Sequence, residues 1–244
     1  MKTPALTDRL AMREKPTDSP VMFQPWSHLL FLHWKVPAEV IQARLPAGLH
    51  VDQHEGTCYL GLVPFLMEKV RPRFLPCAPW LSNFLELNVR TYVFDDDGQP
   101  GVWFFSLDCN QPVAVELARR FFHLPYQHAV MSRDGTRYHC RRKDQEETAT
   151  FDYAVEGPFQ TATPGSLEFF LLERYLLFSA SPDGNLHTGR VHHEPYAFAP
   201  IPVPPHSLLP CRWDGFELEG PPVSALVSPG VPVRIHPLKK ARRG

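Results

Sequence analysis

The chain has 244 residues, of which 43% are hydrophobic and 21% charged. A chain of this length and composition buries about three-quarters of its unfolded surface as a globular body, which excludes a mainly disordered protein. The 25 Lys and Arg against 26 Asp and Glu give a formal net charge of −1. This balance argues against a protein that neutralises the phosphates of a nucleic acid, so we expect no nucleic-acid partner.

Neither a membrane span nor a secretion signal is predicted. The apolar stretch 167–178 is interrupted by Glu168, Glu173 and Arg174 and is shorter than the roughly 18 to 20 residues of a bilayer span. Residues 1–15 carry six charged side chains and no apolar segment of signal-peptide length. The five cysteines are odd in number and contain no CxxC pair, which favours reduced thiols. We therefore expect a cytoplasmic protein without a membrane partner.

In chain order, the hydrophobic pattern predicts short helices between antiparallel strands. Helical periodicity covers 37–44, 112–122 and 164–173, and Val113, Leu117 and Phe121 form one apolar stripe in the second of these. Turn chemistry predicts three hairpins. Their turns are Asp95–Gly98 between strands 88–94 and 102–107, Arg133–Gly135 between 128–132 and 136–142, and Ser181–Gly184 between 175–179 and 186–191.

The absence of repeats and of an internal linker in the first 200 residues predicts one domain over 1–244, with 1–20 as an N-terminal arm. From Pro195 onward there are eleven prolines. Because proline lacks a backbone donor, we expect 197–244 to wrap the surface as extended chain and edge strands, without helices or central strands, and to end in a solvated basic tail. The predicted class is α+β: a mainly antiparallel β-barrel or cone with a few peripheral helices and an interior able to hold a ligand.

The segment 83–93 carries the strongest functional signal. Strand alternation places Glu86, Asn88 and Arg90 on one face and leucine and valine on the other. This pattern is also typical of an amphipathic strand with its polar face in water. The alternative is a ligand site, because an acid, an amide and a guanidinium within about 13 Å of strand suit a small polar molecule in a cavity. Tyr126 lies at a tight helix-to-strand corner after Pro125, where its phenol either projects into the same cavity or packs at the boundary.

Two further groups of residues were considered as sites. Arg71 and Arg73 flank a proline in an extended loop, where they either clamp an anion or are simply solvated. His50, Asp52 and His54 would share one face if extended, but they lie in a predicted loop without a visible supporting partner, so we predict neither a metal nor a cofactor. Hydrolase elbow, Walker, dinucleotide-binding and HExxH signatures are absent from the sequence.

Several segments between about Pro25 and Tyr196 closely resemble the YqjF-like bacterial family of unknown function, which is placed with the acetoacetate decarboxylase-like fold. They are Leu45-Pro46-x-Gly48-Leu49, Val63-Pro64-Phe65, Val70-Arg71-Pro72-Arg73, Glu86-x-Asn88-Val89-Arg90-Thr91-Tyr92-Val93, Gly101-Val102-Trp103-Phe104-Phe105-Ser106-Leu107-Asp108 and Leu124-Pro125-Tyr126.

The resemblance implies a cone or barrel with a central cavity. In acetoacetate decarboxylase a Gly-aromatic-Pro-Lys-Lys corner supplies the lysine that forms a Schiff base with the keto acid. Pro125 matches that proline, so Tyr126 and Gln127 stand where the two lysines would be. A phenol or an amide cannot form an imine, so the resemblance implies a pocket whose original chemistry is lost or replaced. A glutamate on a cavity-lining strand of the decarboxylase resembles Glu86.

These observations predict a protein that binds a small anionic or keto-type molecule. The predicted ligand-binding residues are Glu86, Asn88, Arg90, Tyr126, Arg71 and Arg73. The sequence leaves turnover open: one alternative is a lyase or hydratase without a Schiff base that uses Glu86 as general base, and another is a non-catalytic scaffold or regulatory module with a filled interior. It also leaves open assembly into a homo-oligomer.

Overall fold

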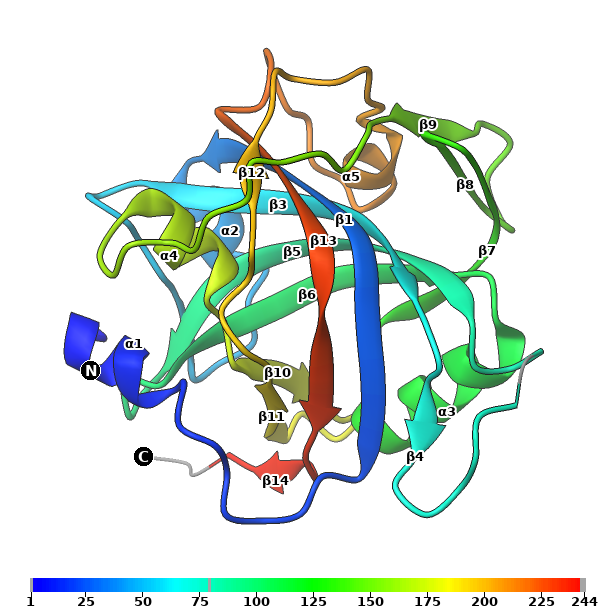
Figure 1. Ribbon diagram of the computed structural model, residues 1–244. Helices are drawn as coiled ribbons and strands as arrows, with labels where there is room; N and C mark the ends of the chain where they lie inside the picture. The colour runs from blue at the N-terminus through cyan, green and yellow to red at the C-terminus, as the bar shows by residue number, and fades with distance from the viewer. Residues whose placement is uncertain (1, 79, 242–244) are drawn as a thin grey trace.

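The computed structural model describes residues 2–78 and 80–241, in which a curved sheet surrounds an interior and short helices lie around it (Figure 1). The helices are α1 (Leu6–Ala11), α2 (Ala38–Gln42), α3 (Pro112–Phe122), α4 (Leu167–Leu172) and α5 (Leu209–Trp213). The strands are β1 (Met22–Val36), β2 (Leu49–Val51), β3 (Cys58–Met67), β4 (Arg71–Pro72), β5 (Phe84–Asp95), β6 (Pro100–Cys109), β7 (Tyr126–Asp134), β8 (Arg137–Arg142), β9 (Ala149–Asp152), β10 (Leu176–Ala180), β11 (Leu186–His192), β12 (Ala199–Pro200), β13 (Ser224–Ile235) and β14 (Lys239–Lys240).

Strand pairing explains the curvature. Hydrogen-bonded neighbours lead from β5 through β3, β1, β13, β11, β10 and β6, and β6 pairs again with β5. The sheet is mostly antiparallel, and β6 pairs in parallel with both β10 and β7. The α+β class and the dominance of strands are therefore confirmed, in the form of a strongly curved sheet. The part of the chain that the structure describes contains no helix with the length and apolarity of a bilayer span.

Alternation along β5 separates two apolar clusters. Leu85, Leu87 and Val89 pack on the side that also holds residues of β7, β8, β9 and α5, whereas Phe84 and Tyr92 belong to the interior cluster. All twelve residues of β5 are buried, because the sheet interior covers one face and the additional layer covers the other. The interpretation of 83–93 as a strand with its polar face in water is therefore wrong.

The local elements largely follow the expected pattern. The three hairpins form as predicted between β5 and β6, β7 and β8, and β10 and β11. The helix predicted over 112–122 is α3, and the one predicted over 164–173 is the shorter α4, whose first turn is capped by the Ser166 hydroxyl accepting from the Phe169 amide at 3.2 Å. All five cysteines are free.

The expectation for the proline-rich C-terminal segment needs correction. β13 is not an edge strand but lies between β1 and β11, although it contains Pro229 and Pro232. On the edge of β13 that points away from β1, the described pairings with β12 and β11 involve only residues 226–227 and 234–235. Pro229 and Pro232 lie between these two stretches, where no neighbouring strand needs a backbone N–H donor from β13. Pro210 is tolerated in α5 because it occupies the first turn. Lys239 and Lys240 are exposed and pair with β11, and residues 242–244 of the predicted tail lie outside the described part.

Candidate functional site

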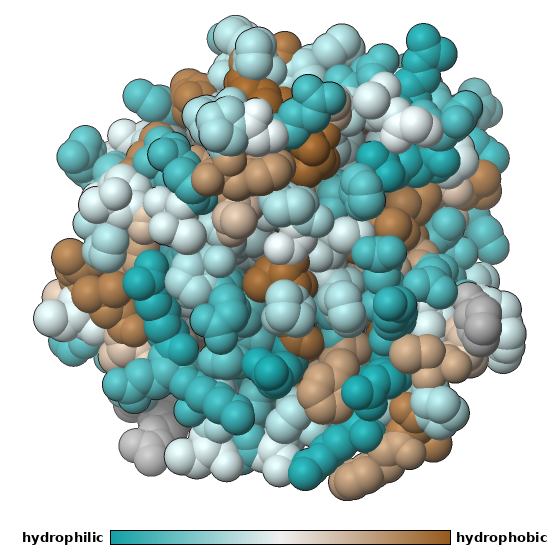
Figure 2. All heavy atoms as spheres, viewed as in Figure 1, coloured by the Kyte–Doolittle hydropathy of each residue, from teal (hydrophilic) through white to brown (hydrophobic). Residues whose placement is uncertain are grey.

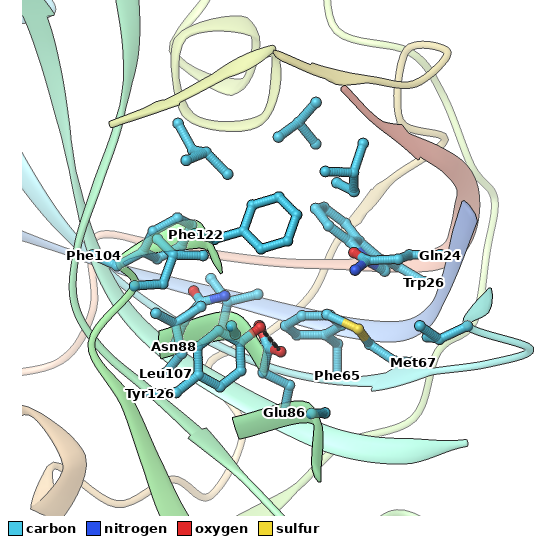
Figure 3. A pocket seen from close by; sticks show the side chains of 18 of the residues that line it. Gln24, Trp26, Phe65, Met67, Glu86, Asn88, Phe104, Leu107, Phe122 and Tyr126 are labelled. Atoms are coloured by element: carbon cyan, nitrogen blue, oxygen red, sulfur yellow. Dashed lines mark hydrogen bonds between the residues drawn. The ribbon is translucent and has the colours of Figure 1, made fainter. Parts of the chain in front are cut away.

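The interior of the curved sheet contains a cavity of about 190 Å³. Its walls come mainly from β1, β3, β5, β6 and α3, and most of its lining side chains are apolar (Figure 3). The aromatic part of the lining consists of Trp26, Phe65, Phe84, Phe104, Phe122, Tyr126 and Tyr196. An enclosure lined mainly by apolar and aromatic side chains strengthens the polar interactions inside it, so the few polar groups that enter it decide its chemistry.

Glu86 and Tyr126 form the polar end of the cavity. The Tyr126 hydroxyl donates to Glu86 Oε2 at 2.6 Å, and the two side chains meet from β5 and β7 (Figure 3). Burial raises the pKa of Glu86 to about 8; hydrogen bonds from Tyr126 and Asn88 oppose the rise, and the charge of Asp108 adds to it. The carboxyl group is therefore mostly neutral at pH 7. In this form it accepts from Tyr126 and retains one O–H donor for a ligand oxygen.

The corner between α3 and β7 fixes the position of Tyr126. The helix ends at Phe122, and His123 takes a left-handed conformation with φ 52°. β7 then starts at Tyr126 opposite Leu107 of β6. Arg119 Nε donates to the Tyr126 carbonyl at 2.8 Å, so the backbone of the corner is held from both the sheet and the helix.

Arg90 and Asn88 bring unused hydrogen-bonding capacity to the cavity. Arg90 is 7% exposed, donates from Nη2 to the Leu171 carbonyl at 3.2 Å, and has no partner at Nε among the described residues. It takes part in none of the ion pairs between those residues. Asn88 Oδ1 likewise has no partner there. A buried cation without a carboxylate, next to an amide oxygen without a partner, suits an anionic ligand with a further polar group.

Arg174 is a lining residue that the sequence interpretation missed. It donates to Asp52 at 2.7 Å, and Asp52 also accepts two hydrogen bonds from Arg9 of α1, at 2.6 and 2.7 Å. Burial lowers the pKa of Arg174 to about 10, while Asp52 acts in the opposite direction. Its only signal in the sequence was a charge that interrupts the apolar stretch 167–178.

The structure brings four of the six predicted ligand-binding residues around the cavity and leaves two outside its lining. Glu86, Asn88, Arg90 and Tyr126 line it, together with Val70 and Pro72. Their neighbours Arg71 and Arg73 turn elsewhere: the Arg71 guanidinium lies 4.4 Å from the centre of the Phe23 ring, and that of Arg73 lies 5.1 Å from the centre of the Phe74 ring. An anion clamp made by this pair would therefore lie beside the cavity opening.

The histidines considered for a metal have separate partners. His50 contacts Asp96 at 2.7 Å, His54 contacts the Gly165 carbonyl at 3.1 Å, and Asp52 is held by the two arginines. Among residues 2–78 and 80–241 no group of three His, Cys, Asp or Glu side chains is arranged to hold a metal ion.

Amine chemistry has no candidate in the cavity wall. All seven lysines are exposed, and none of them lines the cavity. They are Lys2, Lys15, Lys35, Lys69, Lys143, Lys239 and Lys240. The hydrogen-bonded pair at the polar end of the cavity is instead the phenol of Tyr126 and the carboxyl of Glu86.

Comparison with known proteins places this geometry in context. Residues 23–232 match DUF2071, a family described as an uncharacterized conserved protein. The chain is 39% identical over 183 residues to the uncharacterized protein YqjF of Bacillus subtilis strain 168. The aligned region covers 72% of this chain and 74% of that protein.

Solved structures resemble the fold at low sequence identity. An acetoacetate decarboxylase-like enzyme from Sphingomonas wittichii RW1 aligns with a TM-score of 0.62 and 13% identity, over 93% of this chain and 95% of its own. The enduracididine biosynthesis enzyme MppR complexed with pyruvate aligns with a TM-score of 0.58 and 14% identity, over 93% of both chains. Acetoacetate decarboxylase of Legionella pneumophila aligns with a TM-score of 0.56 and 12% identity, over 99% of this chain and 96% of its own.

Proposed function

This chain belongs to the DUF2071 family and has the fold of the acetoacetate decarboxylase-like enzymes, and from this premise we propose that it binds a small organic acid with an apolar body. The carboxylate of the ligand bonds to Arg90. A carbonyl or hydroxyl oxygen accepts from the neutral Glu86 carboxyl, and the apolar body lies against the aromatic lining. The cavity of about 190 Å³ holds roughly six to ten non-hydrogen atoms, since a cavity of about 150 Å³ accepts benzene.

The buried guanidinium of Arg90, which has no carboxylate partner among the described residues, is the observation that carries this proposal. A buried charge is costly unless it is paired, and in the described part of the chain its Nε has no partner. A ligand carboxylate would supply the missing charge and acceptor. MppR, a protein of the same fold, forms a complex with pyruvate, which is a small keto acid.

Imine formation is not part of the proposed chemistry, because every lysine is exposed and none lines the cavity. The scaffold alternative requires Glu86 and Arg90 to neutralise each other. Instead, Glu86 bonds to Tyr126, and Arg90 bonds to the Leu171 carbonyl. The neutral Glu86 carboxyl and the Arg90 guanidinium thus both retain hydrogen-bonding capacity for a ligand. Cytoplasmic location and self-assembly stay predictions.

Ligand titration of Arg90→Gln tests the proposal. By calorimetry, wild-type protein is expected to bind members of a panel of short straight-chain 2-oxo, 3-oxo and hydroxy acids. The variant should bind them roughly 10- to 100-fold more weakly, because hydrogen bonds to a charged group contribute about 1.5–3 kcal/mol. Arg137→Gln, at a side chain 70% exposed on β8, is the matched control and should leave affinity unchanged. Equal affinity of Arg90→Gln and wild type would show that the carboxylate binds elsewhere.

A second candidate function is proton transfer of the lyase or hydratase type. It is favoured by the pKa of Glu86, about 8, which lets one group donate and accept a proton near neutral pH. At pH 7 the carboxyl is mostly protonated, so its ionised minority is the form that takes the proton from the carbon next to the ligand carbonyl. Proton NMR in D₂O detects this activity as exchange of the carbon-bound hydrogens next to a ligand carbonyl. Exchange in wild-type protein that persists in Glu86→Gln would assign it to another group.

A further inference from the structure

The exposed side of α3 carries a stripe of large apolar side chains. The stripe predicted from the sequence, Val113, Leu117 and Phe121, is 42%, 46% and 59% exposed. The opposite face of the same helix packs on the interior cluster through Val115 and Phe122. This short helix therefore presents large apolar side chains to both the core and the solvent. A helix that packs on a core with one face needs apolar side chains on that face only, so the exposed ones are not explained by the fold.

The loop between β4 and β5 adds more exposed apolar side chains beside this helix. Phe74, Leu75 and Trp80 are 86%, 58% and 72% exposed. Gln111, at the start of α3, donates from Nε2 to the Trp80 carbonyl at 3.0 Å, so loop and helix are neighbours (Figure 1). We call the exposed side chains of the two segments the mouth patch. It comprises Phe74, Leu75, Trp80, Val113, Leu117 and Phe121.

The mouth patch lies at the opening of the cavity. Leu117 and Pro72 line the cavity and are themselves exposed, which places the opening between α3 and the segment around β4. Leu81 and Ala118 continue the same wall inward. An apolar surface is therefore continuous from the outside of the molecule to the ligand cavity.

Cations are interleaved with these apolar groups. The Arg73 guanidinium lies 5.1 Å from the centre of the Phe74 ring, and that of Arg120 lies 5.8 Å from the centre of the Phe121 ring. Segments 68–82 and 111–123 contain five Lys and Arg against two carboxylates, whereas the whole chain carries a net charge of −1. One of the two carboxylates, Glu116, already contacts His128 and Arg119. In Figure 2, hydrophobic and hydrophilic residues lie side by side at the lower right of the molecule, where Figure 1 draws β4 and α3.

We propose that the mouth patch docks on the surface of an anionic phospholipid bilayer, with its aromatic and aliphatic side chains in the headgroup region and its arginines on the lipid phosphates. The strong exposure of Phe74 and Trp80 shows a convex surface, which suits insertion into a fluid interface better than a preformed groove for a peptide. Apolar groups with cations beside them match the layered chemistry of acyl chains under phosphates. This is surface docking and not a membrane span, and it departs from the expectation from the sequence that the protein has no membrane partner.

The orientation has a consequence for the ligand, and this part alone rests on the proposed function. With the mouth patch on the bilayer, the cavity opens toward the lipid. An organic acid with an apolar body partitions into that interface, so it could enter the cavity without crossing bulk water. Docking itself requires no ligand and can be tested without one.

Vesicle flotation tests the proposal with full-length protein. Wild type is expected to float with vesicles of phosphatidylcholine and phosphatidylglycerol, to bind vesicles of phosphatidylcholine alone weakly, and to dissociate as salt screens the arginines. Two double variants, Phe74→Asp with Phe121→Asp and Arg73→Glu with Arg120→Glu, should each lower binding at least about tenfold. Val223→Asp and Arg137→Glu, at exposed positions outside the patch, are matched controls and should bind as wild type.

The outcomes separate this proposal from its competitors. Failure of wild-type protein to float with anionic vesicles, or flotation of both double variants as well as wild type, would overturn it. Light scattering supplies the other decisive observation. If wild-type protein is a dimer that does not bind vesicles, and the double variant Phe74→Asp with Phe121→Asp is a monomer, the patch binds a second copy of the chain and the proposal is wrong. Calorimetry with the acid panel is independent, because none of the four substituted residues lines the cavity.

Discussion

Glu86 shows how one buried side chain links the stability of the protein to its chemistry. It is 2% exposed, and burial raises its pKa to about 8, whereas a glutamate in the unfolded chain titrates near about 4.3. Between these values the folded protein keeps a proton that the unfolded chain releases. Stability therefore falls as pH rises through this window and levels off above the folded pKa. The site is thus maintained at a cost in stability at neutral and alkaline pH.

Glu86→Gln should remove this cost. Glutamine has no charge to desolvate and can still accept from Tyr126. Near pH 4.5 the variant and wild type should differ little, and above pH 8 the variant should be more stable by up to about 5 kcal/mol, since the pKa rises from about 4.3 to about 8 and each pKa unit corresponds to about 1.4 kcal/mol. Urea unfolding across this range checks the result, with the exposed Glu156→Gln as control. Parallel stability profiles for wild type and Glu86→Gln would contradict the assignment of a raised pKa.

The extent to which the site was predictable follows from the range of the interactions involved. Glu86, Asn88 and Arg90 share a face because strand alternation is a local property, readable from spacing alone. Tyr126 lies beside them because of a helix-to-strand corner, which Pro125 predicts in the sequence. Arg174 was missed because its place depends on Asp52, 122 residues away in the chain, and no local pattern encodes such a partner.

Among the elements, α1 is joined to the cavity wall by ion pairs to one shared carboxylate. Arg9 of α1 and Arg174 of the wall share the carboxylate of Asp52. Burial alone would raise the pKa of Asp52, but the charges and hydrogen bonds of Arg174 and Arg9 together lower it below its usual value. Stability from this group is therefore present above the unfolded pKa of about 3.9 and is lost as pH falls through the lower folded value.

Arg9→Ala should weaken the connection between α1 and the cavity wall without unfolding the protein. Asp52 keeps Arg174 but loses a two-bond partner, so we expect a loss of about 1–3 kcal/mol at pH 7 and acid unfolding that begins at a higher pH. Thermal unfolding followed from pH 7 downward measures both effects. Lys2→Ala removes the exposed pair with Asp8 and should leave stability nearly unchanged. Equal losses for the two variants would mean that the Arg9 contact adds nothing beyond a surface ion pair.

Element prediction succeeded where local chemistry decides the outcome and was wrong where distant pairing does. The hairpins follow from their turn residues, and α3 was found at its observed bounds. β13 was assigned to the edge because of its prolines, yet it lies inside the sheet, since the second ladder is interrupted where the prolines occur. The sequence shows missing donors but not which donors a neighbouring strand would have used.

At the scale of the whole molecule, the cavity depends on β6, which pairs with β5, β10 and β7. The pairing of β6 with β10 is short and parallel, at Leu177 opposite Val102 and Phe178 opposite Trp103. Val102 and Leu177 both line the cavity. A change that separates these two strands should therefore open the cavity wall as well as weaken the sheet.

Gly101→Ala tests this dependence. A Cβ at Gly101 would lie 2.6 Å from the Leu176 carbonyl oxygen and 2.7 Å from the Phe178 ring, distances at which β6 and β10 must move apart. We expect a loss of about 3 kcal/mol or more, with faster amide hydrogen exchange concentrated in β6 and β10. At Gly135 a Cβ meets no atom within 4 Å, although φ is +57°, so Gly135→Ala isolates the cost of backbone conformation, about 1 kcal/mol. If amide hydrogen exchange in β10 were as slow in Gly101→Ala as in wild type, the pairing of β6 with β10 would not be what holds the cavity wall together.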